Sequence, residues 1–406
     1  MPSSNKLKII NDPVYGFINL PSEDIYDLLQ TIYLQRLRRI KQLGLSNMVY
    51  PGAEHTRFSH SIGAMYLMTK ALQTLQNKAI SITDNEKEFV LQAILLHDIG
   101  HAPFSHCLEN FFFTCEHENL SKEFMRELKV HNYVIEIFED TYKKHFLHQL
   151  VSSQIDIDRL DYLTRDSFFT GVSEGVIGTD RIMSMYNVKD DSLVIDEKGV
   201  YSIEKFIISR RLMYWQVYMH KTVVGVDCLL KNILIRAQDL AFMGDLNENE
   251  CPISKHLSYF LHNGAADISD KEALNHFLLL DDTDIWSSVK IFSQHKDKIL
   301  SFLSKSLISR NLGHVKIKNK IYSEQEINTL INQNCENHKN QGFSRQEIAK
   351  YFCVTNELRN RAYSFKDEGI DILFKNGEVK EIYKASDQLD KNFLSKEIRK
   401  YYYFAI

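Results

Sequence analysis

Residues able to bind a metal ion are concentrated in one part of the 406-residue sequence. Six of its 16 His residues fall between His55 and His117. Among them, His97 and Asp98 follow the apolar run from Val90 to Leu96, so both should lie at the end of a buried helix. A His and an Asp placed next to each other in a protein interior are costly unless a charged group binds them. The stretch LLHDIGHAPFSH around this pair therefore predicts a site that binds a charged group.

Two other segments carry residues of the same kind. His60 lies 37 residues before His97, and Asp158 lies 60 residues after Asp98. If the segment around Asp158 is helical, Tyr162 and the Arg165-Asp166 pair share its face. The apolar residues at positions 155, 157, 160 and 163 indicate that this helix is largely buried, whereas the alternative is a ladder of surface charges. Buried carboxylates would then need partners.

The elements that must position these residues are mostly helices. Helical patterns cover residues 22–43, 56–77, 84–98, 105–112, 117–129, 131–145, a segment from about 153 and a long helix over 203–242, with more helices to about 312. Strands are expected at 15–18, in a hairpin over 190–203, at 315–318 and at 371–383 with an Asn376-Gly377 turn. We therefore predict a mainly α fold, in which a helical core (1–312) with small β-hairpins precedes a smaller α+β C-terminal region (313–406) of unknown role.

Composition excludes several classes of protein. Hydrophobic residues make up 44% and charged residues 25%, which is ordinary globular usage, and only 6 Pro and 16 Gly favour helix. The net charge of −4 gives no indication of nucleic-acid or membrane-surface binding. The most apolar stretch is far shorter than the roughly 20 residues of a membrane helix. The N-terminus has no secretory signal and the six Cys form no C-x-x-C pair, so we expect a cytoplasmic protein.

Several motifs together resemble one known family. His60, His97-Asp98 and Asp158 match the H…HD…D pattern of the HD-domain phosphohydrolases, and the resemblance is closest to the deoxynucleoside triphosphate (dNTP) triphosphohydrolases. It covers residues 13–240. It rests on QRLRRIKQLG at 35–44, PGAEHTRFSHSIG at 51–63, HDIGHAPFSH at 97–106, IDIDRLDY at 155–162 with Arg165-Asp166, and YMHK at 218–221.

This resemblance implies an HD-domain helical core and a metal-dependent reaction. Water would attack the α-phosphorus of a dNTP, which releases deoxynucleoside and inorganic triphosphate. One divalent metal per subunit (Mn, Fe, Zn, Ni or Mg) would bind to two imidazoles and two carboxylates, a ligand set that does not choose among these ions. A further Mg would accompany the triphosphate. The implied metal ligands are His60, His97, Asp98 and Asp158.

The resemblance also implies roles for other side chains. His101 would contact the α-phosphate, and His106, Glu109 and His117 would surround the leaving 5′-oxygen, which needs an acid because it departs as a strongly basic alkoxide. Without the resemblance, His117 reads as an exposed helical His, Arg210 as a solvated charge and Leu43 as core. The implied substrate contacts are Arg57, Arg159 and Arg210 to the phosphates, Tyr162 and Tyr218 to the sugar face, and Gln42, Leu43 and Asp166 to the sugar and its 3′-hydroxyl.

Relatives that are activated by a nucleotide bind it between subunits, so the resemblance also implies a homo-oligomer, either dimer or tetramer, and an effector site. Gln30 stands where those relatives have an Asp that reads guanine. This departure puts activation by GTP in doubt and leaves another nucleotide effector plausible. The residues that match the effector pocket, with Gln30 as the departure, are Gln30, Gln35, Arg38, Val49, Tyr50, His220 and Lys221.

Two other functions stay open on the sequence alone. One is an HD phosphohydrolase that acts on a nucleoside monophosphate, a guanosine alarmone, a cyclic nucleotide or single-stranded DNA. The other is a non-catalytic nucleotide-binding module. The three arginines at 57, 159 and 210 favour a triphosphate substrate, and the intact set of metal ligands argues against a protein without activity.

Overall fold

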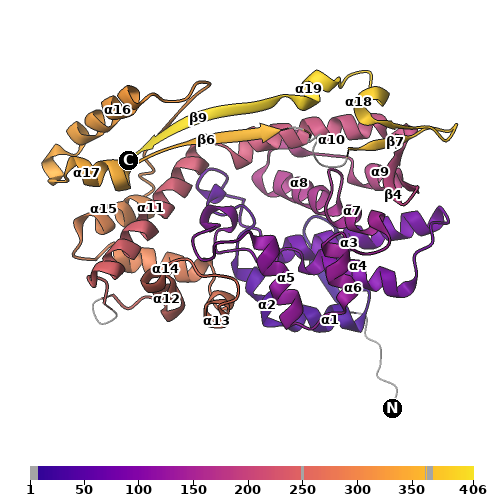
Figure 1. Ribbon diagram of the computed structural model, residues 1–406, viewed down its shortest axis with the longest axis horizontal. Helices are drawn as coiled ribbons and strands as arrows, with labels where there is room; N and C mark the ends of the chain where they lie inside the picture. The colour runs from indigo at the N-terminus through magenta and orange to yellow at the C-terminus, as the bar shows by residue number, and fades with distance from the viewer. Residues whose placement is uncertain (1–7, 248–250, 362, 364–368) are drawn as a thin grey trace, which may run out of the picture.

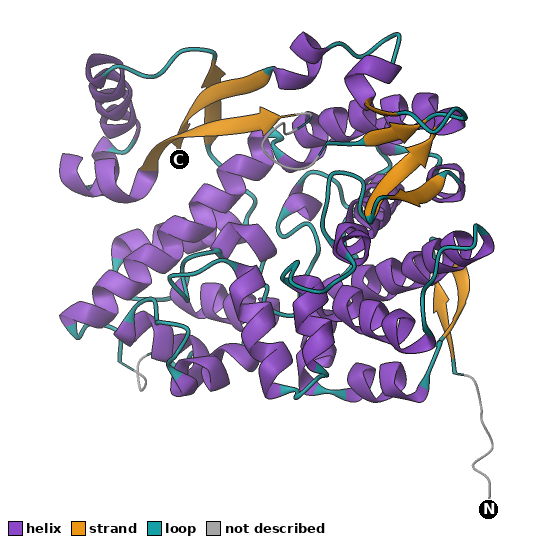
Figure 2. Cartoon of the chain, turned by 45° about the vertical axis from the view of Figure 1, so that its right-hand side comes forward, coloured by secondary structure: helices purple, strands orange, loops and turns teal. Residues whose placement is uncertain are grey.

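The fold is mainly helical, as predicted. The computed structural model describes residues 8–247, 251–361, 363 and 369–406 (Figure 1). Residues 1–7, which begin the N-terminal segment predicted to have no secretory signal, lie outside this range. Helices make up 57% of the structure, and small sheets lie at its edges (Figure 2). One continuous apolar core includes residues from Ile18 to Ile406, so the C-terminal strands pack against the same core as the N-terminal helices.

Three helices at the centre carry the metal-binding candidates. Helix α3 (Arg57–Asn77) begins at the capping box of Thr56, and α4 (Asp84–Leu96) begins at that of Thr83. Helix α8 (Ile157–Thr170) begins at Asp156, whose side chain accepts a hydrogen bond from the Arg159 amide. Both α3 and α4 are buried over most of their surface, which is typical of helices inside a core. Helices α3 and α4 begin within one residue of their predicted starts, whereas α8 begins at Ile157 rather than near residue 153.

The N-terminal helical prediction is only partly correct. Strands β1 (Ile9–Asp12) and β2 (Gly16–Asn19) form a hairpin, and α1 (Glu23–Gln30) follows. The single helix predicted over 22–43 is interrupted at Thr31, which is extended (φ −70°, ψ 151°). A short helix α2 (Ile32–Arg36) and a 3₁₀ turn (Leu37–Arg39) then lead to the loop that contains Gln42.

The helix predicted over 105–112 is wrong. Only Ser105–Leu108 form a 3₁₀ turn, because Phe104 and Ser105 lie in the left-handed region with φ of 55° and 56°. The carboxylate of Asp282 accepts a hydrogen bond from the Phe104 amide at 2.7 Å and supports this conformation. The helix predicted over 131–145 ends early, because α6 covers only Asn132–Phe138, and the next helix, α7 (His145–Val151), begins at the last residue of the predicted range.

Two predictions around residue 200 are also wrong in part. Strand β4 (Ser192–Asp196) forms, but it pairs with the preceding β3 (Tyr186–Lys189), and Val200 begins helix α10 (Val200–Met213). The turn between these strands uses Asp190 and Asp191 with positive φ, which Asp tolerates better than most residues. The long helix predicted over 203–242 is broken by a π-helical turn (Tyr214–Tyr218), after which α11 (Lys221–Met243) begins at His220.

The residues after 312 contribute strands to two sheets. Strand β7 (Asp371–Leu373) pairs in parallel with β4 and antiparallel with β8 (Val379–Glu381), which confirms the predicted hairpin. Strand β9 (Glu397–Ala405) lies between β5 (His314–Lys318) and β6 (Cys353–Arg361). Figure 1 shows β6 and β9 side by side along one edge of the molecule. The boundary near 312 stays a prediction, although one sheet crosses it.

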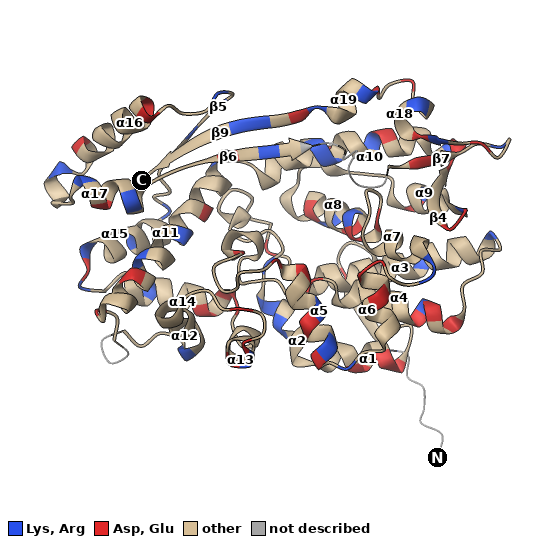
Figure 3. Ribbon diagram, in the orientation of Figure 1, with Lys and Arg blue, Asp and Glu red and all other residues tan. Residues whose placement is uncertain are grey.

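The remaining helices complete the body around this core. They are α5 (His117–Glu127), α9 (Thr179–Ser184), α12 (Lys255–Asn263), α13 (Lys271–Leu278), α14 (Asp282–Phe292), α15 (Lys298–Ile308), α16 (Glu324–Asn337), α17 (Arg345–Glu347), α18 (Ile382–Ala385) and α19 (Lys391–Ser395). Within the described ranges, no helix has both the length and the hydropathy needed to cross a membrane. Acidic and basic residues are interspersed over most elements (Figure 3).

Candidate active site

The four predicted metal ligands come together at the centre of the molecule. His60 is on α3, His97 and Asp98 follow α4, and Asp158 is in the first turn of α8. The Nε2 atoms of His60 and His97 are 3.3 Å apart, and each faces Asp158 Oδ1, at 3.0 Å and 3.5 Å. Both histidines are buried, His60 completely. His60, His97 and Asp158 can thus offer one ligand atom each to a shared ion.

The hydrogen bonds on the other side of each ring indicate which nitrogen is free. His97 Nδ1 donates to the Ile94 carbonyl at 2.6 Å, and His60 Nδ1 donates to Asp161 Oδ2 at 2.7 Å. Both Nε2 atoms therefore direct lone pairs at each other and at a carboxylate, an arrangement that needs a cation. Burial lowers the pKa of His60, but its bonds to Asp158 and Asp161 outweigh this effect and raise the pKa to about 10, so Nε2 holds a proton unless another cation takes its place. The donor set fits a divalent metal ion bound by nitrogen and oxygen.

Asp98 lies beside these three residues and has additional partners. Its Oδ1 is 3.3 Å from His97 Nε2 and 3.3 Å from His101 Nε2, and its Oδ2 is 3.7 Å from His60 Nε2. The Arg57 guanidinium donates to Oδ2 and, through Nε, to Ser105 Oγ at 2.7 Å. Although burial opposes it, His97 and Arg57 hold the pKa of Asp98 well below its usual range. Arg57, which is predicted to bind phosphate, is only 3% exposed and is paired with the Asp98 carboxylate.

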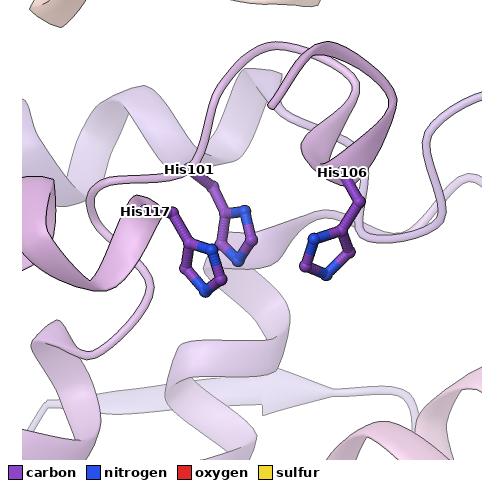
Figure 4. A group of neighbouring side chains, drawn as sticks. All are labelled: His101, His106 and His117. Atoms are coloured by element: carbon purple, nitrogen blue, oxygen red, sulfur yellow. The ribbon is translucent and has the colours of Figure 1, made fainter. Parts of the chain in front are cut away.

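The predicted catalytic residues form a second histidine group next to this cluster. Glu109 joins two of them, because its carboxylate accepts from His106 Nδ1 at 2.9 Å and from His117 Nδ1 at 2.7 Å. The rings of His101 and His117 stack with centroids 3.7 Å apart, and His106 faces them (Figure 4). The hydrogen bonds from His106 and His117 hold the pKa of Glu109 well below its usual range. Burial lowers the pKa of His101 well below its usual value, so His101 is neutral.

These three histidines are also close enough to bind an ion, but their geometry suits proton transfer better. Stacked rings direct their nitrogens alongside one another rather than to one point. Glu109 instead holds two of the imidazoles through their Nδ1 atoms. A cavity of about 240 Å³ connects this group with the buried cluster, and His97, Asp98, His117 and Asp158 contribute to its wall.

The predicted sugar contacts are held together by Asp166. Its Oδ2 accepts from the Tyr218 hydroxyl at 2.7 Å, and its Oδ1 lies 2.7 Å from His55 Nε2. The rings of Tyr162 and Tyr218 meet edge to face with centroids 6.1 Å apart. As predicted, Asp158, Tyr162 and Asp166 follow one another along one side of α8.

The remaining predicted substrate contacts lie in the same part of the molecule. Arg159 donates through Nε to the Ser153 carbonyl at 2.6 Å and to Asp156 at 3.1 Å. Arg210 Nε and Gln42 Oε1 are buried and have no hydrogen-bond partner among the described residues. Leu43 is half-buried and packs against the core, as the alternative interpretation holds. The unpartnered atoms of Arg210 and Gln42 are the polar groups that a bound ligand would satisfy.

Comparison with known proteins shows the family. The sequence profile of the HD domain matches residues 57–166, and that of the HD associated region matches residues 177–244. A phosphohydrolase from Bacteroides thetaiotaomicron VPI-5482, known from its crystal structure, has a TM-score of 0.92 and 47% sequence identity over 98% of this chain and 99% of that one. This chain belongs to the HD-domain phosphohydrolase family.

Two protein sequences extend the comparison. The uncharacterised protein YwfO of Bacillus subtilis is 32% identical over 399 residues, which cover 93% of this chain and 88% of that protein. The deoxynucleoside triphosphate triphosphohydrolase SAMHD1 homolog of Dictyostelium discoideum is 31% identical over 275 residues, which cover 61% of this chain and 52% of that protein. The match with this chain thus spans about half of the SAMHD1 homolog.

The predicted effector residues form two sets in this HD phosphohydrolase. In the first, Gln35 donates to the Leu29 carbonyl at 2.6 Å and accepts from Arg38 at 3.0 Å, while Gln30 is exposed at the end of α1. In the second, the rings of Tyr50 and His220 meet edge to face, Val49 precedes Tyr50, and Lys221 is exposed at the start of α11.

Sequence reasoning missed the residues that support the cluster. Asp161 binds His60, and Asp282 accepts from the Phe104 amide in the loop after His101 and from the Lys41 amide beside Gln42. The i, i+4 spacing of Asp161 and Arg165 was a usable signal for the first. No local signal identifies Asp282, because its partners lie 178 and 241 residues away.

Proposed function

We propose that this HD phosphohydrolase hydrolyses dNTPs to deoxynucleosides and inorganic triphosphate. The observation that carries the proposal is the buried pair of Nε2 atoms, 3.3 Å apart on His60 and His97, that faces two aspartates beside the Glu109-bound imidazoles. The substrate class is supported by the similarity to SAMHD1 proteins, which are named as dNTP triphosphohydrolases.

Each predicted residue has a contribution to make. His60, His97, Asp98 and Asp158 would hold one divalent metal, which would polarise a phosphoryl oxygen and activate water when bound. His101, which is neutral, would contact the α-phosphate. Arg159 and Arg210 would bind the remaining phosphates, and a second Mg could bind there too. Arg57 would bind phosphate while it stays paired with Asp98.

His106 and His117, the two imidazoles bound to Glu109, would supply the proton that the leaving 5′-oxygen needs. Glu109 is ionised and accepts from both Nδ1 atoms, so it holds the two imidazoles in place. The side chain of His106 is 67% exposed and that of His117 is 17% exposed, so solvent can return the proton through His106 after each cycle. We assign the proton donor to this pair as a unit.

Sugar selection would come from Tyr218 and Leu43. The Tyr218 hydroxyl is fixed on Asp166, so the ring cannot turn away from a ligand without breaking that bond. A 2′-hydroxyl would meet the ring and leave its own hydrogen bonds unmade, and a site can reject a substrate strongly on that basis.

The test is product analysis with each dNTP and each NTP, with Mn²⁺ or Mg²⁺ and without metal. Anion-exchange chromatography separates inorganic triphosphate from stepwise phosphate release. We expect deoxynucleoside and triphosphate from dNTPs and no turnover of NTPs. Equal rates on dATP and ATP, or release of monophosphate, would favour an HD phosphohydrolase for another phosphoester, and binding without turnover would favour a nucleotide-binding module.

We also propose a homo-oligomer with a nucleotide bound between subunits. A Gln at position 30 offers one acceptor and one donor to a guanine edge, where a carboxylate offers two acceptors. An unmade buried hydrogen bond costs about 1–3 kcal/mol, so GTP should activate weakly or not at all. Initial rates with each dNTP, alone and with GTP, and light scattering test this, and strong activation together with GTP-driven assembly would contradict it.

A further inference from the structure

A line of buried charged contacts leads from the candidate metal ligand His60 to the N-terminal hairpin. Asp161 Oδ2 accepts from His60 Nδ1 at 2.7 Å and from Arg165 Nε at 2.9 Å, and Asp161 Oδ1 accepts from Arg165 Nη2 at 3.1 Å. The guanidinium also donates from Nη1 to Asp12 Oδ2 at 2.8 Å. We refer to Asp12, Arg165 and Asp161 as the support chain.

Burial makes the charge balance of the support chain important. The side chains of His60, Asp161 and Arg165 are 0% exposed and that of Asp12 is 4% exposed. Two carboxylates and one guanidinium leave one negative charge that solvent does not screen. Such a charge is costly in an interior unless a cation compensates it nearby. The adjacent position for that cation is the far side of the His60 ring, where Nε2 faces His97 and Asp158.

The backbone around the support chain is arranged to admit it. Gly63 lies one turn after His60 on α3, and a Cβ there would be 2.1 Å from Arg165 Nη2 and 2.2 Å from Asp161 Oδ1. In the hairpin, Asp12 Oδ1 accepts from the Val14 and Tyr15 amides, which leaves Oδ2 for Arg165. The glycine and the hairpin turn therefore both fit the geometry of this ion pair.

We propose that Asp161, held in place by Arg165 and Asp12, is a positioning residue that keeps the proton of His60 on Nδ1 and makes Nε2 a stronger ligand. The arrangement is that of a carboxylate hydrogen-bonded to a metal-ligating imidazole, which fixes the tautomer and raises the basicity of the ligand. The proposal deepens the proposed function and rests on its metal site. It also makes the β1–β2 hairpin, which lies outside the matched HD-domain residues, part of the site.

The first test is metal affinity without any nucleotide. Metal-free protein is titrated with Co²⁺ alone, followed by absorption and by calorimetry, for the wild-type protein, Asp161→Asn and Asp12→Asn. The Asn side chain keeps an acceptor oxygen and removes the charge. We expect Asp161→Asn to weaken Co²⁺ binding about 10- to 100-fold, and Asp12→Asn to weaken it less. The matched control is Asp297→Asn, which breaks the Arg236–Asp297 pair between α11 and α15 and should leave the affinity unchanged.

The second test is a spectroscopic signature that a purely structural role would not change. In the proton NMR spectrum of Co²⁺-loaded protein, a ligating His that keeps a proton on Nδ1 gives a shifted N–H resonance that disappears in D₂O. We expect the His60 resonance to exchange slowly in the wild-type protein, and to exchange faster or move in Asp161→Asn.

A folded Asp161→Asn variant with wild-type Co²⁺ affinity and an unchanged resonance would overturn the proposal. If this variant does not fold, Asp12→Asn decides, and an unchanged affinity there would overturn the proposal as well. These measurements are independent of the reaction. A wild-type protein that binds Co²⁺ in this way but hydrolyses no dNTP would refute the proposed function and leave the support chain standing.

Discussion

The Nε2 atoms of His60 and His97 lie 3.3 Å apart and face the same carboxylate, so each of these residues is needed to hold a metal ion between them. Removing one ligand leaves the others with uncompensated lone pairs and charge. We predict that His97→Ala or Asp98→Ala abolishes bound metal and turnover together, because each variant loses a group that faces the ion. Metal analysis of the purified variants and a dNTP assay check this. Full metal content with wild-type turnover in either variant would show that the assigned site is wrong.

Asp227 on α11 gives a prediction about pH. Burial raises its pKa to about 6, and its Oδ1 has no hydrogen-bond partner among the described residues. The unfolded chain releases this proton near the ordinary value of 3.8, so the contribution of Asp227 to stability is complete below pH 4 and falls as pH rises to 6.

Asp227→Asn should therefore raise the melting temperature more at pH 7.5 than at pH 4.5. The difference between the two pH values corresponds to about 2 kcal/mol of unfolding free energy. Thermal unfolding at both pH values measures it. An equal shift at the two values would mean that the carboxyl titrates normally in the folded protein.

Among the elements, those defined by local signals could be predicted and those defined by distant partners could not. Helices α3 and α4 combine a continuous apolar surface with capping boxes at Thr56 and Thr83, so their starts are predictable within one residue. Strand β6 has the polar sequence CVTNELRNR, and it forms because β9 pairs with it along nine residues. The candidate ligands were predictable from motifs, whereas their supports at Asp12 and Asp282 depend on contacts across more than 100 residues.

The carboxylate that supports the loop after α4 gives a prediction about activity. Asp282, at the start of α14, accepts from the Phe104 amide at 2.7 Å and from the Lys41 amide at 2.9 Å, and so joins the loops that carry His106 and Gln42. Asp282→Ala should lower kcat at least about tenfold with unchanged metal content, because the left-handed Phe104 loses its support. Unpaired buried amides cost about 1–3 kcal/mol of unfolding free energy each.

A matched control exists on the neighbouring helix. Asp270 caps α13 by accepting from two amides of its own helix, Glu272 at 3.0 Å and Ala273 at 3.1 Å. Asp270→Ala should lose about 1 kcal/mol of unfolding free energy, the usual cost of removing a helix N-cap, and keep wild-type kcat. If the two variants lose activity equally, Asp282 contributes only to folding.

At the scale of the whole molecule, the C-terminal region is joined to the helical core. Strand β7 pairs with β4, and α11 packs against later residues, since Asn232 donates to the Tyr351 carbonyl at 2.9 Å. We predict that a chain of residues 1–312 aggregates or melts at a much lower temperature than the full chain, because it exposes this side of α11. Solubility and calorimetry of the truncated chain check this. Cooperative unfolding near the full-chain temperature would identify residues 313–406 as a separate domain.

The parallel pairing of β4 with β7 also sets an order of events during synthesis. Val194 of β4 pairs with Asp371 of β7, so roughly 180 residues must be made before the first strand meets its partner. At about 5–20 residues per second, the ribosome needs on the order of ten to thirty-five seconds for that stretch. Throughout that interval one edge of β4 is unpaired, and an exposed strand edge is a place where another chain can attach. The newly made protein therefore keeps this strand edge open to other chains until the start of its last tenth has been made.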